Sequence, residues 1–254
     1  MGEWVWAGFL AFFVVSLVVG VRLVLLWRRT RQLPELLIGI GVLGIGPVGF
    51  GAMMLGAALV AGGASPSAIG VRGVFALGAA TVAAGILAKC VFNWQVYRPG
   101  SGAARAATWA IGTGLVVLYV HAGVSRGFLP AQPVDVSTVG QSVLQVSALL
   151  WGSVEAIRYW RLMRKRTALG LADAVVTNRF LLWSLGAAAA AIGTAIGTAA
   201  AWWTGSASLQ IPWVVTSSSL HGMTAAIAMW LAFVPPRAYT SWVRRRAAAR
   251  PASA

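Results

Sequence analysis

The chain has 254 residues, of which 59% are hydrophobic and 10% charged, and its mean hydropathy is +0.79. A soluble globular domain carries roughly 25% charged and about 45–50% apolar residues, so the composition excludes an ordinary soluble domain and predicts a polytopic membrane protein. The net charge is +15, with 20 Lys and Arg against 5 Asp and Glu, and the single cysteine, Cys90, excludes an intrachain disulfide. Because the basic residues lie between apolar runs, we expect them to contact anionic lipid headgroups at the cytoplasmic face and not nucleic acid.

Seven apolar segments are long enough to cross a bilayer, which takes about 20 residues. In chain order they cover residues 4–27, 35–61, 71–97, 104–126, 136–160, 178–203 and 211–235. The first segment is not typical of a signal peptide, because it ends at Trp27-Arg28-Arg29 and lacks a small-residue cleavage site. The sequence therefore predicts an all-α fold: seven transmembrane helices in one bundle over residues 1–240, followed by a short basic cytoplasmic tail over residues 241–254.

The orientation follows from the distribution of Lys and Arg over the connections. The connections after the first, third and fifth segments are basic, above all at residues 161–166, whereas those after the second, fourth and sixth are nearly free of charge. Basic connections stay in the cytoplasm, so the N-terminus is expected outside and the C-terminus inside. The abundance of Ala, Gly and Arg is typical of a GC-rich bacterial genome, and we expect a multi-pass protein of the bacterial inner (cytoplasmic) membrane.

Two segments carry glycine patterns with a structural meaning. Pro47 lies near the middle of the second segment among glycines, which predicts a helix break. This break either exposes carbonyl groups to a binding site, as in secondary transporters, or only permits close packing of small residues. In the sixth segment Gly193 and Gly197 form a GxxxG pattern, which predicts helix packing, with a homodimer contact as the alternative.

Polar residues inside the expected spans form a candidate intramembrane site: Lys89, Asn93, Gln141, Gln145, Glu155, Ser217 and His221. Steps of three and four residues place Gln141, Gln145 and Glu155 on one face of the fifth helix. Charges inside a membrane are costly unless they are paired, so we expect Lys89 to contact Glu155, which lies at a similar depth. Alternatively, Lys89 reaches the cytoplasmic interface and Glu155 pairs with Arg158 on its own helix.

His121 and His221 are weak candidates for metal or haem ligands, because two histidines on facing helices can bind either group. No cofactor is predicted on this evidence. Ser125 lies in Gly123-Val124-Ser125-Arg126-Gly127, which matches GxSxG, but that motif needs a strand-to-helix turn and here ends a helix. Enzymatic activity stays undecided, with the sequence favouring none.

A seven-helix bundle with its N-terminus outside resembles opsins and G-protein-coupled receptors in outline. The last segment has no lysine that could hold retinal, and the receptors' cytoplasmic motifs are absent, so the resemblance is limited to the outline. The polar site favours a small-solute transporter or ligand-binding channel with an unidentified small-molecule ligand. The alternatives are a sensory or scaffold protein that signals to a cytoplasmic partner and, as a minor option, a haem-binding electron carrier.

Overall fold

The computed structural model describes residues 6–130 and 134–248, and these residues form helices and no strand. In chain order the helices are α1 (Ala7–Thr30), α2 (Leu33–Leu43), η2 (Gly44–Phe50), α3 (Gly51–Ala61), α4 (Ile69–Phe92), η3 (Asn93–Tyr97), α5 (Gly102–Arg126), α6 (Val136–Ala168), α7 (Ala174–Thr204), η4 (Ser208–Gln210), α8 (Pro212–Phe233) and α9 (Arg237–Ala248). The segments η2 and η3 are π-helical and η4 is a 3₁₀ turn. The prediction of an all-α fold is confirmed.

Five stretches of helix are long and apolar enough to cross a membrane: α1, α2 with α3, α4 with η3, α5 and α7. A sixth span results when α8 is counted together with α9, which is bent from it by 78°. The chain is therefore a multi-pass membrane protein. The fifth expected span is part of α6, which is not among these five. The polar and basic side chains of α6 make it less apolar than the helices that are counted. The count of seven spans and the orientation of the termini stay predictions.

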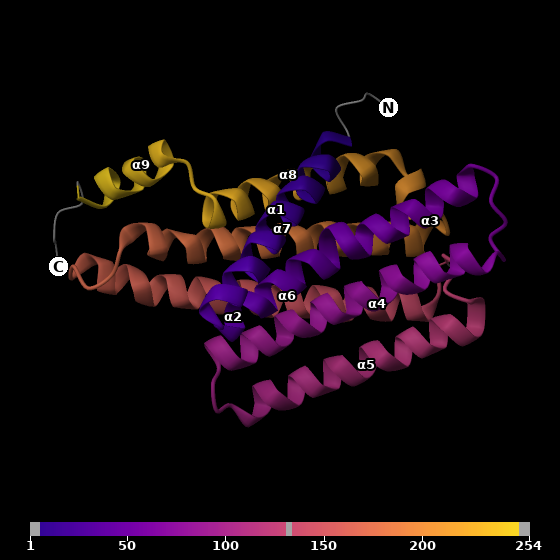
Figure 1. Ribbon diagram of the computed structural model, residues 1–254, viewed down its shortest axis with the longest axis horizontal. Helices are drawn as coiled ribbons and strands as arrows, with labels where there is room; N and C mark the ends of the chain where they lie inside the picture. The colour runs from indigo at the N-terminus through magenta and orange to yellow at the C-terminus, as the bar shows by residue number, and fades with distance from the viewer. Residues whose placement is uncertain (1–5, 131–133, 249–254) are drawn as a thin grey trace.

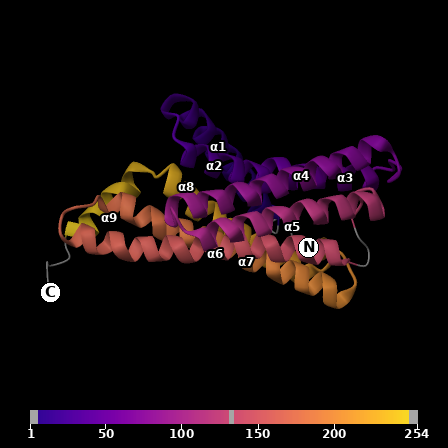
Figure 2. The ribbon, with the colours of Figure 1, turned by 90° about the horizontal axis from the view of Figure 1, so that it is seen from below.

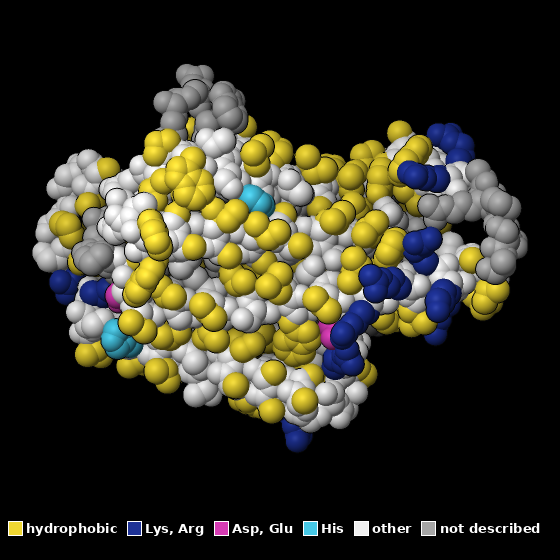
Figure 3. Space-filling model, turned by 180° about the vertical axis from the view of Figure 1, so that it is seen from behind, with side chains coloured by type: hydrophobic (Ala, Val, Ile, Leu, Met, Phe, Trp, Pro, Cys, Tyr) yellow, Lys and Arg dark blue, Asp and Glu magenta, His cyan; other side chains and the backbone are white. Residues whose placement is uncertain are grey.

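The helices from α3 to α8 run roughly along the long axis of the molecule, and α1 and α2 lie obliquely to them (Figures 1 and 2). Lys and Arg side chains gather at one end, which we call the basic end (Figure 3). The connections that follow α3, α5 and α7 lie at the opposite end, called the far end (Figure 1). Apolar side chains cover the surface between the two ends, for example Leu10, Val116 and Leu220, which are 64%, 62% and 60% exposed. Such a belt suits contact with lipid.

Local capping residues explain where the helices begin. Asp135 accepts a hydrogen bond from the Thr138 amide at the start of α6, and Asp173 accepts from the amides of Val175 and Val176 at the start of α7. Such caps satisfy amide groups that have no partner inside the helix. Asp173 thus starts α7 four residues before the expected start at Asn178. All seven expected segments coincide with helices within a few residues, except that α6 continues to Ala168.

The second span is irregular at the position of the expected break, where Pro47 lies inside η2. The backbone of Gly46 has φ −88° and ψ −106°, outside the helical region, and the wide turns of η2 surround it. A Cβ atom at Gly46 would lie 2.9 Å from the Cβ of Ser16 on α1, so only glycine fits against that helix. The break therefore combines the missing amide of Pro47 with the close approach of α1.

The sequence did not predict α9. The chain turns at Pro235 and forms a helix from Arg237, so the expected boundary at residue 240 falls inside α9. Asn178 of α7 donates a hydrogen bond to the Tyr239 hydroxyl, and Arg244 lies 3.6 Å from Asp173. These contacts fasten the basic tail helix to the start of α7.

Candidate functional site

A large cavity, which we call the vestibule, occupies the far half of the bundle. Its volume is about 710 Å³, and its wall includes Phe128 and Ser208 of the far-end connections. Three of the predicted site residues line it: Gln141 and Gln145 of α6 and His221 of α8. The structure therefore brings the outer half of the predicted polar face together with the polar position of α8.

A smaller cavity, the inner cavity, lies next to the vestibule. Lys89, Ser16 and Trp183 line it, and the rest of its wall is mostly apolar. The space that the centre of a water molecule can occupy is about 60 Å³. A water needs about 10–15 Å³ by this measure, so there is room for roughly four waters.

Four residues line both cavities and form what we call the constriction: Phe12 of α1, Ile45 of η2, Ala190 of α7 and Ala225 of α8. Two of them, Phe12 and Ile45, are bulky, and the two alanines are small. Ile45 directly precedes Gly46, the residue with the non-helical backbone. The break in the second span therefore sets the position of one wall of the constriction.

Lys89 reaches the inner cavity across the glycine-rich surface of α2. Its Cγ atom lies 3.0 Å from where a Cβ of Gly41 would be, and its Nζ atom lies 4.6 Å from the centre of the Trp183 ring. A cation over an aromatic face is stabilised by the ring electrons. No carboxylate among the residues that the structure describes forms an ion pair with Lys89.

The expected contact between Lys89 and Glu155 is wrong. Arg98 Nε donates to Glu155 Oε1 at 2.9 Å, and Arg158 Nη1 donates to the same oxygen at 3.3 Å. The alternative pairing within α6 is thus present, and Arg98 adds a partner that the sequence did not predict. The reason is the turn that follows η3, which places Arg98 against α6, while Lys89 on the preceding helix faces α2 and α7.

Asn93 joins two helices and lies outside both cavities. Its side chain is 2% exposed, and its Nδ2 atom donates to the Ala148 carbonyl of α6 at 3.3 Å. Gly152 provides the space, because a Cβ there would lie 3.2 Å from Asn93 Oδ1. At Gly152 the predicted polar face is therefore a packing surface between η3 and α6.

His221 is held by the helix on which it lies. Its Nδ1 atom is 2.7 Å from the Ser217 carbonyl and 3.4 Å from the Ser217 hydroxyl. Gly193 packs directly against it, with a Cβ position 3.1 Å from the His221 Cβ. Gly193 and Gly197 thus face α8 of the same chain and line the vestibule. A homodimer contact through these glycines stays a prediction.

Aromatic side chains close the bundle between the inner cavity and the basic end. Neighbouring rings in this aromatic layer have centres 4.8 to 5.9 Å apart, and its members are Phe92, Tyr97, Tyr159, Phe180, Trp183 and Phe233. Trp183 and Phe233 also line the inner cavity. The aromatic layer therefore adjoins the inner cavity.

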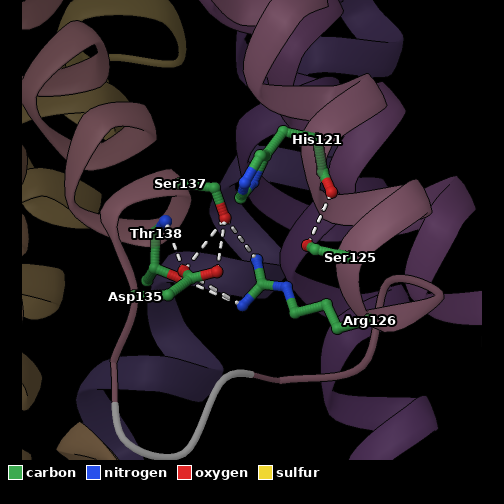
Figure 4. Close-up of polar contacts among 6 residues, drawn as sticks. All are labelled: His121, Ser125, Arg126, Asp135, Ser137 and Thr138. Atoms are coloured by element: carbon green, nitrogen blue, oxygen red, sulfur yellow. Dashed lines mark hydrogen bonds and ion pairs between the residues drawn. The ribbon is translucent and has the colours of Figure 1, made fainter.

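A polar cluster at the far end is built around Arg126 (Figure 4). Among the described residues that line the vestibule, Arg126 is the only charged one. Arg126 Nη1 donates to Asp135 and Thr138, each at 3.2 Å, and Nη2 donates to Ser137 at 3.0 Å. The Arg126 Nε atom is buried and has no partner in the described part of the chain. This donor is a candidate contact for a ligand at the mouth.

The pKa of Asp135 is set by opposing effects. Partial burial raises it, but the hydrogen bonds from Thr138 and Ser137 and the charge of Arg126 outweigh burial and hold the pKa of Asp135 below 3.8, its ordinary value. Asp135 is therefore ionised at neutral pH and offsets part of the charge of Arg126.

The histidines and Ser125 are not brought together. His221 lines the vestibule, whereas His121 is exposed on α5 and is not part of that wall. Within residues 6–130 and 134–248, no group of three or more His, Cys, Asp or Glu side chains gathers as a metal site would require. The Ser125 hydroxyl donates to the His121 carbonyl on its own helix at 2.6 Å (Figure 4). The metal and haem alternatives stay untested predictions with no third ligand in view.

Sequence reasoning missed Ser16, Phe12, Ile45 and Trp183, because small or apolar residues in a span carry no signal of their own. Only the glycines opposite them mark a close approach.

Comparison with family models, curated proteins and solved structures finds no match for this chain. The geometry of the two cavities therefore carries the functional argument.

Proposed function

We propose that this protein is a transporter that moves a small solute through the vestibule and the inner cavity. The observation that carries this proposal is that the two cavities share the four residues of the constriction. A solute that enters from the far end meets the polar side chains of Gln141, Gln145 and His221, passes Phe12 and Ile45, and reaches Lys89. Binding sites near the middle of the membrane, next to a broken helix, are typical of secondary transporters.

The proposal includes seven spans, with the basic end in the cytoplasm of a bacterium. α6 lies against α4, α5 and α7 and contributes Gln141 and Gln145 to the vestibule wall. A helix that packs on three spans and lines a cavity between them is best placed across the membrane. Counting α6 and α8 as spans puts the N-terminus outside, in agreement with the rule that basic connections stay inside.

The two barriers along this path differ in thickness. The constriction is a single ring of side chains, whereas the aromatic layer is built from six residues on α4, η3, α6, α7 and α8. A channel needs one continuous opening, but a transporter needs two barriers that open in turn. We therefore favour a transporter in a state that faces the far end, with the break at Gly46 as the hinge that moves Ile45.

The test blocks the constriction. Purified protein in proteoliposomes is screened for flux of a broad panel of small solutes, and Ala190→Leu is compared with wild type. Three extra carbon atoms between Phe12 and Ile45 are expected to slow flux by at least about tenfold, which corresponds to about 1.4 kcal/mol in the barrier. Ala195→Leu is the matched control, since Ala195 is exposed on the same helix and its variant is expected to keep wild-type flux.

Two outcomes contradict the proposal. One is a wild-type protein that moves no solute in the panel although it elutes as a single folded species in detergent. The other is an Ala190→Leu protein that moves the solute as fast as wild type does. A solute that binds but never crosses favours the second candidate, a sensor, whose output would pass through α9, which Asp173 and Asn178 fasten to α7.

A further inference from the structure

We propose that the path selects small anions: Arg126 attracts the anion at the mouth, and the Lys89 ammonium with the Ser16 hydroxyl binds it in the inner cavity. This inference rests on the proposed function and names the substrate class for the same site. The class is a monovalent anion of up to about four non-hydrogen atoms, since the inner cavity has room for roughly four waters.

The charges along the path have one sign. In the walls formed by described residues, Arg126 is the only charged residue of the vestibule and Lys89 the only one of the inner cavity. A cleft lined by positive charge and apolar walls concentrates anions and repels cations. Neither cavity wall includes a described carboxylate, and each of these groups has a partner: Glu35 binds Thr30, Glu155 binds Arg98 and Arg158, Asp173 binds Arg244, and Asp135 binds Arg126 at the mouth, where it offsets part of that charge.

Lys89 has no counterion among the described residues, although a charge inside a membrane is costly without one. Intramembrane charges usually pair with one another or with backbone carbonyl groups. Within residues 6–130 and 134–248, the Nζ atom lies over the face of Trp183, which stabilises a cation without neutralising it. An anion in the inner cavity would supply the missing pairing, and this makes the cavity a binding site with a charge preference.

Ser16 provides an independent observation. Its side chain is fully buried, it lines the inner cavity, and its Oγ atom has no hydrogen-bond partner within the described ranges. A buried hydroxyl without a partner is costly, and a ligand that accepts its hydrogen bond removes this cost. The described residues with polar side chains in this wall are Lys89, Ser16 and Trp183, and each of these side chains carries a hydrogen-bond donor. Such a set fits an acceptor ligand.

Arg126 explains how an anion would enter. Two of its nitrogen atoms bind Asp135, Ser137 and Thr138, which fixes the guanidinium at the vestibule wall (Figure 4). The buried Nε atom has no acceptor in the same described region. Arg126 therefore offers one donor and part of its charge at the mouth, which suits a weak first contact and not tight binding.

The first experiment measures binding without transport. The thermal unfolding of the purified protein is followed in gluconate buffer as sodium formate, acetate, nitrate or chloride is added. A ligand that binds the folded state raises Tm with concentration, and the rise increases logarithmically beyond the dissociation constant. We expect formate to raise Tm and formamide, its neutral counterpart of the same size, to leave it unchanged. Replacing sodium by potassium or choline is expected to have no effect.

The second experiment assigns the site. Lys89→Met keeps an unbranched side chain, one atom shorter, and removes its charge, and it is expected to weaken anion binding by at least about tenfold. Lys165→Met, the same change at an exposed position of the basic end, is expected to bind as wild type does. Ser16→Ala removes only a hydroxyl that has no partner, so this variant keeps its fold and tests the site even where Lys89→Met does not fold. It is expected to weaken binding severalfold.

The outcomes separate this inference from the proposed function. If neutral solutes cross and no anion raises Tm, or if formamide binds as well as formate, the inference is wrong and transport stands. If anions bind at Lys89 but no solute crosses, transport is wrong and the anion site stands. Wild-type binding in Ser16→Ala and Lys89→Met overturns the assignment of the site to the inner cavity.

Discussion

The Lys89 ammonium lies 4.6 Å from the centre of the Trp183 ring, on the wall of the inner cavity. Trp183 packs in turn against Phe92 and Phe233, with ring centres 5.9 and 5.4 Å away. The ring therefore connects the cation to the aromatic layer that closes the basic end. In the proposed transport path, this layer is the second barrier, and Trp183 is the member of the layer that contacts Lys89.

Replacement of Trp183 by leucine is expected to lower both stability and anion affinity. The cation–π contact is worth about 0.5–2 kcal/mol, and contacts with the two neighbouring rings are lost as well. Unfolding in detergent measures the loss of stability, and titration with formate measures the loss of anion affinity. Trp183→Phe is the control, because it keeps a ring at this place and is expected to lose less of each. Equal behaviour of Trp183→Leu and wild type in both measurements contradicts the argument.

The ion pairs of Glu155 predict a specific pattern of energetic coupling. Arg98 and Arg158 are 44% and 58% exposed, so solvent screens them and each pair contributes no more than about 1 kcal/mol. In a double-mutant cycle, Arg98→Gln and Glu155→Gln are expected to be non-additive in the free energy of unfolding. Lys89 and Glu155 do not form an ion pair with each other, so the effects of Lys89→Met and Glu155→Gln on the free energy of unfolding are expected to be additive. Coupling in the second cycle and none in the first would restore the contact expected from the sequence.

Much of the fold follows from the sequence because lipid imposes a strong rule. Every backbone group inside the bilayer needs a partner, so apolar runs of sufficient length form helices, and their ends are fixed by residues such as Asp173 and Gly205. Pro47 predicted the break for an equally local reason. α9 escaped prediction because Arg244 and Tyr239 bind residues of α7, and such contacts leave no pattern in a short basic segment.

The candidate site was harder to predict, because helix rotation decides which side chains meet. Similar depth suggested that Lys89 would contact Glu155, but depth leaves the direction of each side chain undetermined. Gly41 has no side chain, so Lys89 packs against α2 and reaches α7. The turn after η3 places Arg98, and not Lys89, next to Glu155. Ser16 and Ile45 became visible only through the cavities that they line.

Replacement of Pro47 by alanine is expected to change flux more than stability. Alanine restores an amide donor in η2 and removes the ring that obstructs a regular helix, so the second span becomes straighter and Ile45 leaves its place in the constriction. Stability is expected to stay equal or rise. Solute flux is expected to change by about tenfold or more in proteoliposomes. Pro212→Ala is the matched control, because Pro212 stands in the first turn of α8, where proline is tolerated. Unchanged flux in Pro47→Ala contradicts a hinge at this position.

Acidification is expected to destabilise the far end through Asp135. The pKa of this carboxyl group is below 3.8, its ordinary value, in the folded state, so the unfolded chain binds its proton more readily. The stabilisation is fully present above the ordinary pKa and is lost as the pH falls through the lower pKa of the folded state. Unfolding of wild type by denaturant, measured between pH 7 and pH 3, is expected to show this loss at the acidic end.

Two variants separate the cap from the charge of Asp135. Asp135→Asn keeps an acceptor for the Thr138 amide but loses the ionised carboxylate, so it is expected to be less stable than wild type at neutral pH and to lack the acid-dependent loss. Asp135→Ala loses the cap as well and is expected to lose about 1 kcal/mol more, because the first turn of α6 then has an unpaired amide. Asp135→Asn also leaves the charge of Arg126 without an opposing carboxylate, so faster anion entry is expected at neutral pH. Slower entry in Asp135→Asn would contradict the role of Arg126 at the mouth, since removing a negative charge can only strengthen its attraction for anions.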